Sequence, residues 1–137
     1  MADTIRKVDY YYTTAPNKPG EGARVLGLLR NAGVNLLAFT GFPSGRRSQL
    51  DFVPADAAAL VAACRAAKVK LSRRKTAFLI DGDDRVGAAA DIMRKLGAAK
   101  INVTAIDAIC TGGGRYGAIL WVKPRDVNKA AGVLGAM

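Results

Sequence analysis

The feature that most constrains this chain is an internal repeat. When the sequence is shifted by 67 residues, Asn17-Lys18-Pro19-Gly20 aligns with Asp84-Arg85-Val86-Gly87 without a gap. The apolar positions after this loop align as well: Ala23, Val25, Leu26 and Leu29 fall on Ala90, Ile92, Met93 and Leu96. Further along the shift becomes 70, because the second copy has extra turn residues at Gly112-Gly113-Gly114. A period of this kind means that one supersecondary unit is used twice.

Each copy has the same predicted order of elements. An apolar run rich in β-branched or aromatic residues comes first, at residues 8–14 and 76–80. After a loop, apolar residues at positions i, i+1 and i+4 predict a helix with one buried stripe. The remaining predicted elements are a second strand (34–39 and 101–109), a Gly-rich turn, a third strand (49–53 and 116–122) and a helix opened by Pro54 or Pro124.

This order predicts an α+β fold of two ferredoxin-like βαββαβ units in tandem, with antiparallel strands in the order 4-1-3-2 and both helices on one face. We place the domains at residues 1–71 and 72–137. Residues 69–71 provide a fourth strand for the first copy, whereas the second copy ends in its second helix and lacks its own C-terminal strand. We expect residues 69–71, or a strand swapped from another subunit, to cover the open edge beside residues 76–80. The two copies are therefore not expected to be independent.

Composition excludes several classes of protein. The chain has no histidine, so imidazole-dependent triads and metal sites are impossible. Cys64 and Cys110 lie in apolar runs and are interpreted as core residues without a disulfide. The acidic stretch Asp81-Gly82-Asp83-Asp84 lacks the spacing of a calcium loop and is interpreted as a plain loop. We therefore expect no enzyme activity, no metal and no cofactor.

Partners and compartment are constrained by charge and hydropathy. No run approaches the ~18 apolar residues of a membrane helix, and the start of the chain has no apolar signal core, so we expect no membrane and a cytoplasmic location. The formal net charge of +10 permits phosphate binding, but we interpret it as a solvated surface, because scattered lysines and arginines are common.

Two motifs recur at the same register. The first copy has Asn17-Lys18-Pro19-Gly20 before its first helix and Gly33-Val34-Asn35-Leu36 after it. The second copy has Asp84-Arg85-Val86-Gly87 and Lys100-Ile101-Asn102-Val103, with Val86 where proline is usual and Lys100 where glycine is usual. With these motifs the chain resembles a tandem ACT domain protein, from about Lys7 to Met137. The ACT domain is a small regulatory module that binds amino acids.

The residue chemistry supports that resemblance independently. Gly20 and Gly87 lie where a strand turns into a helix, so a ligand can approach the backbone and meet free N–H groups at the positive helix end, which suits a carboxylate. Asn35 and Asn102 can both donate and accept, and Asp84 is a candidate partner for an ammonium group. Tight turns and helix-exit caps remain alternative roles for the glycines and asparagines.

The resemblance implies that the ligand lies between two modules, with the loop of one facing strand 2 of the other. The candidate ligand-binding residues are Asn17, Lys18, Pro19, Gly20, Asn35, Leu36, Asp84, Arg85, Gly87, Asn102 and Val103. We predict a non-catalytic regulatory or sensor protein that binds a free amino acid or a similar small molecule. A homodimer is the expected assembly, and a regulated enzyme is a further candidate partner.

The alternative hypothesis is an RNA-binding module of the same topology, the RNA recognition motif, which stacks bases on aromatic rings of strands 1 and 3. Strand 1 offers Tyr10, Tyr11 and Tyr12, but strand 3 has Asp51 in the first copy and Ala118 in the second where a ring is needed. The best phosphate patch is Lys68, Lys70, Arg73, Arg74 and Lys75, which we interpret as a solvated linker. Nucleic acid is therefore not the expected partner.

Overall fold

The predicted periodicities become strands and helices of an α+β fold. The computed structural model describes residues 3–137. The elements are β1 (Thr4–Pro16), α1 (Glu21–Asn31), β2 (Leu36–Ser44), β3 (Arg47–Pro54), α2 (Ala57–Ala66), β4 (Lys75–Asp83), α3 (Ala88–Ala98), β5 (Val103–Cys110), β6 (Arg115–Val122), the 3-10 turn Pro124–Asp126 and α4 (Val127–Leu134). No helix within residues 3–137 is long and apolar enough to cross a membrane.

The chain divides into two compact units that do not coincide with the sequence copies. The inner unit is Asp9–Lys75. The terminal unit combines Thr76–Met137 with the N-terminal segment up to Val8. The strand β1, which is 13 residues long, therefore contributes its first part to the terminal unit and the rest to the inner unit. The division at residues 71 and 72 remains a prediction about the repeat.

The terminal unit has the predicted strand order, completed in an unexpected way. Its strands are ordered β1-β4-β6-β5, which corresponds to 4-1-3-2 with residues 4–8 of β1 as the fourth strand. The pairs β4–β6 and β5–β6 are antiparallel. On β1, the C-terminal residue forms two backbone bonds: Met137 N–H donates to Ile5 O (3.0 Å), and Lys7 N–H donates to Met137 O (3.1 Å).

The expectation that residues 69–71 or another subunit cover the edge of β4 is therefore wrong. The segment 69–72 instead lies beside β1 in its own copy, although it is not a regular strand. Ser72 N–H donates to Tyr12 O (2.8 Å), and Thr13 Oγ1 donates to Lys70 O (2.7 Å). Because these bonds occupy the segment within the inner unit, the edge of β4 is left for the chain's own N-terminal residues.

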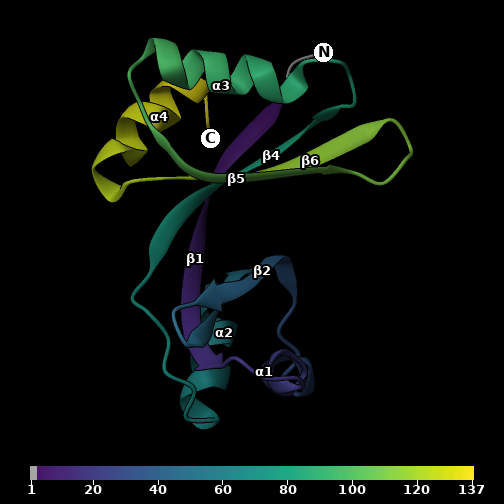
Figure 1. Ribbon diagram of the computed structural model, residues 1–137, viewed down its shortest axis with the longest axis vertical. Helices are drawn as coiled ribbons and strands as arrows, with labels where there is room; N and C mark the ends of the chain where they lie inside the picture. Colours follow the sequence, from purple (N-terminus) through teal and green to yellow (C-terminus); the bar gives the residue numbers. More distant parts are fainter. Residues whose placement is uncertain (1–2) are drawn as a thin grey trace. The chain divides into compact units, whose positions relative to one another are not determined.

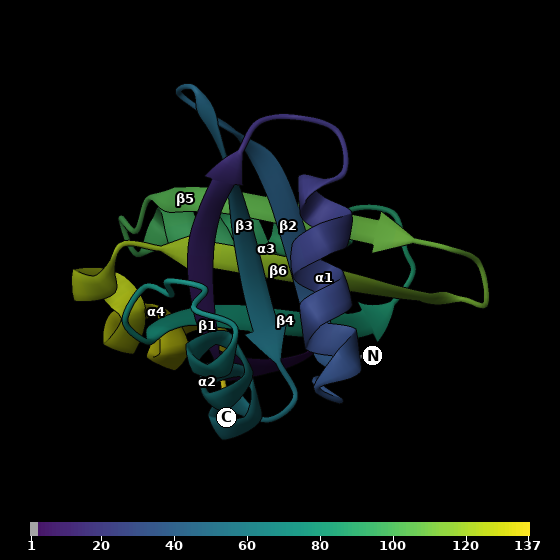
Figure 2. The ribbon, with the colours of Figure 1, turned by 90° about the horizontal axis from the view of Figure 1, so that it is seen from below.

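The inner unit has its core on one face of β1, β2 and β3. The pairs β1–β3 and β2–β3 are antiparallel, and Tyr11 lies opposite Phe52 on the core face. Both α1 and α2 pack against that face (Figure 2). The core residues are Tyr11, Ala15, Val25, Leu29, Val34, Leu50, Phe52, Leu60 and Cys64. The predicted burial of Cys64 is confirmed.

The terminal unit repeats this arrangement, with α3 and α4 on one side of β4, β5 and β6 (Figure 1). Ile92 and Leu96 are buried on α3, as Val25 and Leu29 are on α1, so the shift of 67 residues relates the buried helix positions. The register irregularity in β2 between Leu36 and Ala38 recurs in β5 between Val103 and Ala105. The remaining core side chains include Ile5 of the N-terminal segment, which is 5% exposed.

Candidate functional site

The loops predicted to bind a ligand lead from a strand into a helix at equivalent places in the two units. Gly20 precedes α1 with φ of 90°, and Gly87 precedes α3 with φ of 84°, a left-handed conformation that favours glycine. Neither helix start has a side-chain cap, whereas Asp56 caps α2 by accepting the Ala59 N–H (3.2 Å). The first turns of α1 and α3 therefore keep N–H groups without a partner in the helix.

At the loop of the inner unit the structure contains a cavity of about 310 Å³. Its lining comes from the ends of β1 and β2, the loop, the first turn of α1 and β3: Ala15, Pro16, Lys18, Glu21, Gly22, Phe39, Gly41, Phe42, Pro43, Ser48 and Leu50. Phe39 and Phe42 are each 41% exposed and provide apolar surface. The cavity thus combines an apolar wall with one cation, one carboxylate and a helix start.

Of the predicted residues in this loop, Lys18 lines the cavity. Asn17 anchors the loop, because its Oδ1 accepts a hydrogen bond from Ser48 Oγ (3.0 Å). The carboxylate of Glu21 is held by Arg24, whose Nε (3.2 Å) and Nη2 (3.0 Å) both donate to Oε1. Both bonds use the same oxygen of Glu21, so the second carboxylate oxygen takes no part in this ion pair.

The asparagine motifs lie at the other end of each first helix. The 11 residues of α1 extend over about 16 Å at the usual rise, and Asn35 follows its C-terminus. The carbonyl of Asn35 accepts the Ala55 N–H (2.9 Å) while its side chain is exposed, and Leu36 packs against the core. In the terminal unit Asn102 is exposed and Val103 packs against the core in the same way. Within one unit the two motifs are therefore not brought together.

Sequence reasoning missed Glu21, Phe39, Phe42 and Ser48 as neighbours of the loop. The topology contains the signal that could have identified the aromatic residues. Because β1 and β2 are both antiparallel to β3, they run parallel to each other and end at the same edge as the loop. The second half of β2, rather than its first residues, is thus the part that meets the loop of its own unit.

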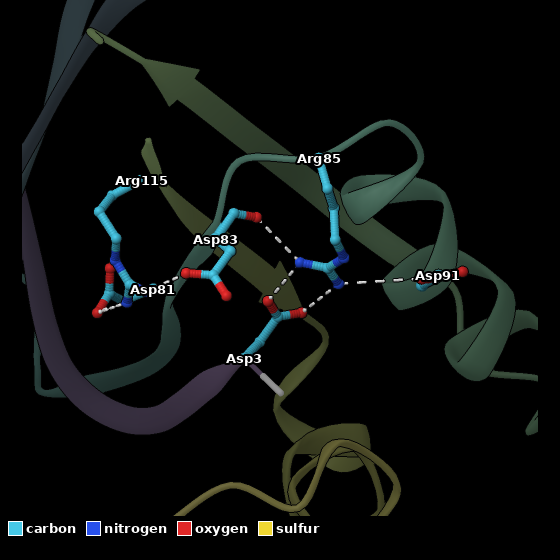
Figure 3. Close-up of polar contacts among 6 residues, drawn as sticks. All are labelled: Asp3, Asp81, Asp83, Arg85, Asp91 and Arg115. Atoms are coloured by element: carbon cyan, nitrogen blue, oxygen red, sulfur yellow. Dashed lines mark hydrogen bonds and ion pairs between the residues drawn. The ribbon is translucent and has the colours of Figure 1, made fainter. Parts of the chain in front are cut away.

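The loop of the terminal unit differs, because Arg85 is bound within the structure (Figure 3). Its Nη1 donates to Asp3 Oδ1 (3.0 Å) and to the Asp83 carbonyl (3.1 Å), and its Nη2 donates to Asp3 Oδ2 (3.3 Å). Asp91 Oδ2 lies 3.9 Å from Nη2. The guanidinium thus fastens the N-terminal segment to the turn between β4 and α3, which leaves it poorly placed to meet a ligand.

A second arginine neutralises the acidic stretch (Figure 3). Arg115 Nη2 contacts Asp81 Oδ2 and its Nη1 contacts Asp83 Oδ1, both at 2.7 Å. These pairs are well exposed, so their net contribution to stability is small. The interpretation of residues 81–84 as a plain loop is wrong for the first three, which belong to β4.

The expectation that Cys110 lies in the core is wrong, because this residue is exposed at the end of β5. The hydrogen bond to the neighbouring Asp84 carboxylate, together with its negative charge, raises the pKa of the thiol above its ordinary value. The apolar run that suggested burial lies on β5, a strand at the edge of the terminal unit. Several of its residues are exposed, including Ile109 at 67%.

The pKa of Asp3 gives a test of the Arg85 contact. Burial by itself raises the pKa of this carboxyl, but the hydrogen bond from Arg85, with smaller contributions from Tyr116 and Lys95, holds it below its ordinary 3.8. A lowered folded-state pKa means stabilisation that is complete above pH 3.8 and is lost as the pH falls through the folded-state value. We expect Asp3→Asn to flatten the acid limb of a melting-temperature profile below about pH 4. Parallel profiles for the two proteins would show that the contact contributes nothing.

The strand face that an RNA recognition motif would use is occupied by the unit's own side chains. Tyr11 is turned into the core, which leaves Tyr10 and Tyr12 on the opposite face. The Nζ atom of Lys75 lies 5.9 Å and 5.4 Å from the centroids of those two rings. Asp51 lies opposite Tyr12 and is buried, which raises the pKa of its carboxyl despite a hydrogen bond from Gln49 and the charge of Lys75. Base stacking is not supported by this arrangement.

Comparison with known proteins is informative at the level of structure. No family model matches the sequence, and no curated protein matches it. The protein BT0572 from Bacteroides thetaiotaomicron matches with a TM-score of 0.83 and 15% identity over 96% of this chain and 88% of that one. The ligand-free regulatory subunit of aspartate kinase from Thermus thermophilus matches with a TM-score of 0.65 and 17% identity over 98% and 95% of the two chains.

The regulatory subunit of aspartate kinase from Thermus flavus is similar to the same extent, with a TM-score of 0.61 and 19% identity over 98% of this chain and 95% of that one. These identities establish the fold alone. The predicted α+β, antiparallel, ferredoxin-type architecture is confirmed at that level, and the chain has an ACT-like fold.

Proposed function

We propose that this chain is a non-catalytic regulatory or sensor protein, built of tandem ACT-like modules, that binds a free amino acid at the loop of the inner unit. The observation that carries the proposal is the uncapped start of α1 beside a cavity that also holds Lys18 and Glu21. An α-amino acid needs donors for its carboxylate and an acceptor for its ammonium group, and this cavity has both.

The ligand's carboxylate accepts hydrogen bonds from the first-turn N–H groups near Gly22, with Lys18 adding a positive charge. Its ammonium group meets the carboxylate oxygen of Glu21 that Arg24 does not use. The side chain lies against Phe39 and Phe42. A cavity of about 310 Å³ suits a ligand of this size.

The similar aspartate kinase chains are named regulatory subunits, which supports a regulatory role here. Asn35 and Asn102 are exposed beside β2 and β5, where a module of a second copy of the chain in a homodimer can reach them. A second site at Asp84 and Gly87 would require Arg85 to release Asp3. We therefore place the amino acid at the inner loop.

Calorimetry with matched glycine variants tests the placement, after a thermal-shift screen of the twenty amino acids has identified the ligand. A Cβ at Gly20 or at Gly87 meets nothing within 4 Å, and both residues have strongly positive φ. Gly20→Val and Gly87→Val therefore carry the same backbone strain. We expect Gly20→Val to abolish binding, because the side chain blocks the helix start, and Gly87→Val to preserve it.

A third variant tests the ammonium contact. Glu21→Gln keeps the shape of the side chain but removes its charge, so we expect about tenfold weaker binding, as for the loss of one charge-assisted bond. If no amino acid binds the wild type, or if both valine variants bind as the wild type does, the amino-acid site is not at this loop.

A further inference from the structure

The inner unit has a second and larger cavity, of about 490 Å³, at the end of α2. It lies where the segment 67–72 passes the C-terminal part of β1 and the first half of α1. Its lining residues are Tyr12, Thr13, Thr14, Arg24, Val25, Arg47, Ala67, Lys68, Val69, Lys70, Leu71 and Ser72. None of these residues lines the cavity proposed for the amino acid, although Arg24 also pairs with Glu21 of that cavity, so the larger cavity is a separate site.

The charged residues that line this cavity are all positive. Four of its lining residues, Arg24, Arg47, Lys68 and Lys70, are cationic, and no lining residue is acidic. Arg24 is compensated by Glu21. Arg47 donates only to neutral acceptors, Thr14 Oγ1 (3.2 Å) and the Thr14 carbonyl (3.4 Å). In the described chain no carboxylate forms an ion pair with Arg47, Lys68 or Lys70, so about three positive charges are uncompensated.

Lys68 has a left-handed backbone conformation, which is unfavourable for residues other than glycine. It follows the end of α2 with φ of 57°, where the chain leaves the helix through the bond from Val69 N–H to the Cys64 carbonyl (2.8 Å). At the corresponding exit of α1 the residue is Gly33, with φ of 73°. Glycine fits this conformation without strain, whereas the lysine adds a cation at the cavity.

We propose that this cavity binds a small phosphorylated molecule carrying two or three negative charges. A phosphate monoester has a charge of about −1.5 to −2 at neutral pH, and a diphosphate adds to it, which matches the uncompensated cations. The planar guanidinium of Arg47 suits the bidentate geometry of phosphate oxygens. Val69 and Leu71, which are half-buried, provide surface for the uncharged part of the molecule. The cavity volume lies within the usual range for small-molecule sites.

Titration calorimetry on the full chain tests the proposal, with pyrophosphate as the probe at about 0.15 M salt, where exposed charges are largely screened. We expect Lys68→Gly to weaken pyrophosphate binding about tenfold, as for one lost charge-assisted contact, while raising the melting temperature. Lys100→Gly is the matched control, because Lys100 has the same backbone strain (φ of 60°) and lies outside the cavity. It should raise the melting temperature and leave binding unchanged. Arg47→Gln should also weaken pyrophosphate binding. It should not change the rise in melting temperature that either glycine substitution causes.

Three outcomes would overturn the proposal. The first is no pyrophosphate binding by the wild type at that salt concentration. The second is equal weakening by Lys68→Gly and Lys100→Gly, which would assign the binding to the net charge of the chain. The third is tighter binding of an oligouridine RNA than of pyrophosphate with the same dependence on Lys68, which would assign the phosphate to nucleic acid.

Discussion

A chain that begins at Asp9 is expected to lose the fold of the terminal unit. Residues 4–8 form one strand of that unit, and their removal leaves one edge of β4 without its backbone partners. The removal also deletes Ile5 from the core and Asp3 from its bonds with Arg85. Truncating a buried isoleucine alone typically costs about 2–5 kcal/mol, which is a large part of the stability of a small domain.

Tryptophan fluorescence follows this effect, because the single tryptophan of the chain, Trp121, lies on β6 of the terminal unit. We expect the truncated chain to lose the cooperative thermal transition of this signal. The fragment Asp9–Lys75, which contains all the core residues of the inner unit, is expected to retain its helical circular dichroism. An unchanged Trp121 transition in the truncated chain would contradict the assignment of residues 4–8 as the missing strand.

A rearranged chain provides the control. Residues 76–137 followed by a Gly/Ser linker and residues 3–8 contain every strand of the terminal unit, and Met137 already contacts Ile5 and Lys7. This chain is expected to fold, whereas residues 73–137 alone are expected not to. The cut near Ser72 that the repeat suggests as a boundary therefore separates β4 from its partner.

Gly82→Ala is expected to destabilise the terminal unit by about 1–3 kcal/mol, the usual cost of overpacking. A Cβ at Gly82 would collide with the Asp3 carboxylate and lie 2.8 Å from Cε1 of Tyr116. Neither neighbour can move freely, because Asp3 is held by Arg85 and Tyr116 is 5% exposed in the core. The substitution therefore forces the N-terminal segment away from β4.

Gly117→Ala is the matched control, since Gly117 also lies within a strand of the terminal unit and its nearest neighbour would be the Ile80 carbonyl at 3.8 Å. It is expected to be neutral or slightly stabilising, because alanine is favoured over glycine in a strand by about 0.5–1 kcal/mol. Urea denaturation of the two variants measures the difference. Equal free energies of unfolding would show that the contact between Gly82 and Asp3 does not constrain the fold.

The order and class of the elements were predictable because the constraints on them are local. The shift of 67 residues preserves the buried positions Val25 and Leu29 in Ile92 and Leu96, and it preserves the glycines at the helix starts. The fourth strand of the terminal unit was not predictable in this way. Residues 4–8 contain two adjacent charged residues, Arg6 and Lys7, and only Ile5 among the five is fully buried. They therefore lack the alternation of apolar and polar residues that predicts a strand.

The part of the candidate site that could be predicted from the sequence is the part that depends on local backbone conformation. The left-handed conformations of Gly20 and Gly87 follow from strand-to-helix turns, which the sequence shows directly. The role of Arg85 depends on Asp3, which is 82 residues away, and no local pattern indicates that contact. Phe39 and Phe42 line the cavity because β2 ends beside β1, which is a property of the sheet rather than of either motif.

Because β1 contributes to both units, its first residues are synthesised before the inner unit but are expected to fold after it. Residues 4–8 are synthesised well before β4, which begins only at Lys75. The inner unit is complete by then and, with its own core, is expected to fold first. During that interval the N-terminal residues are an unpaired strand edge attached to a folded unit, and such edges are sites of aggregation. The charges of Arg6 and Lys7 reduce that risk in the nascent chain.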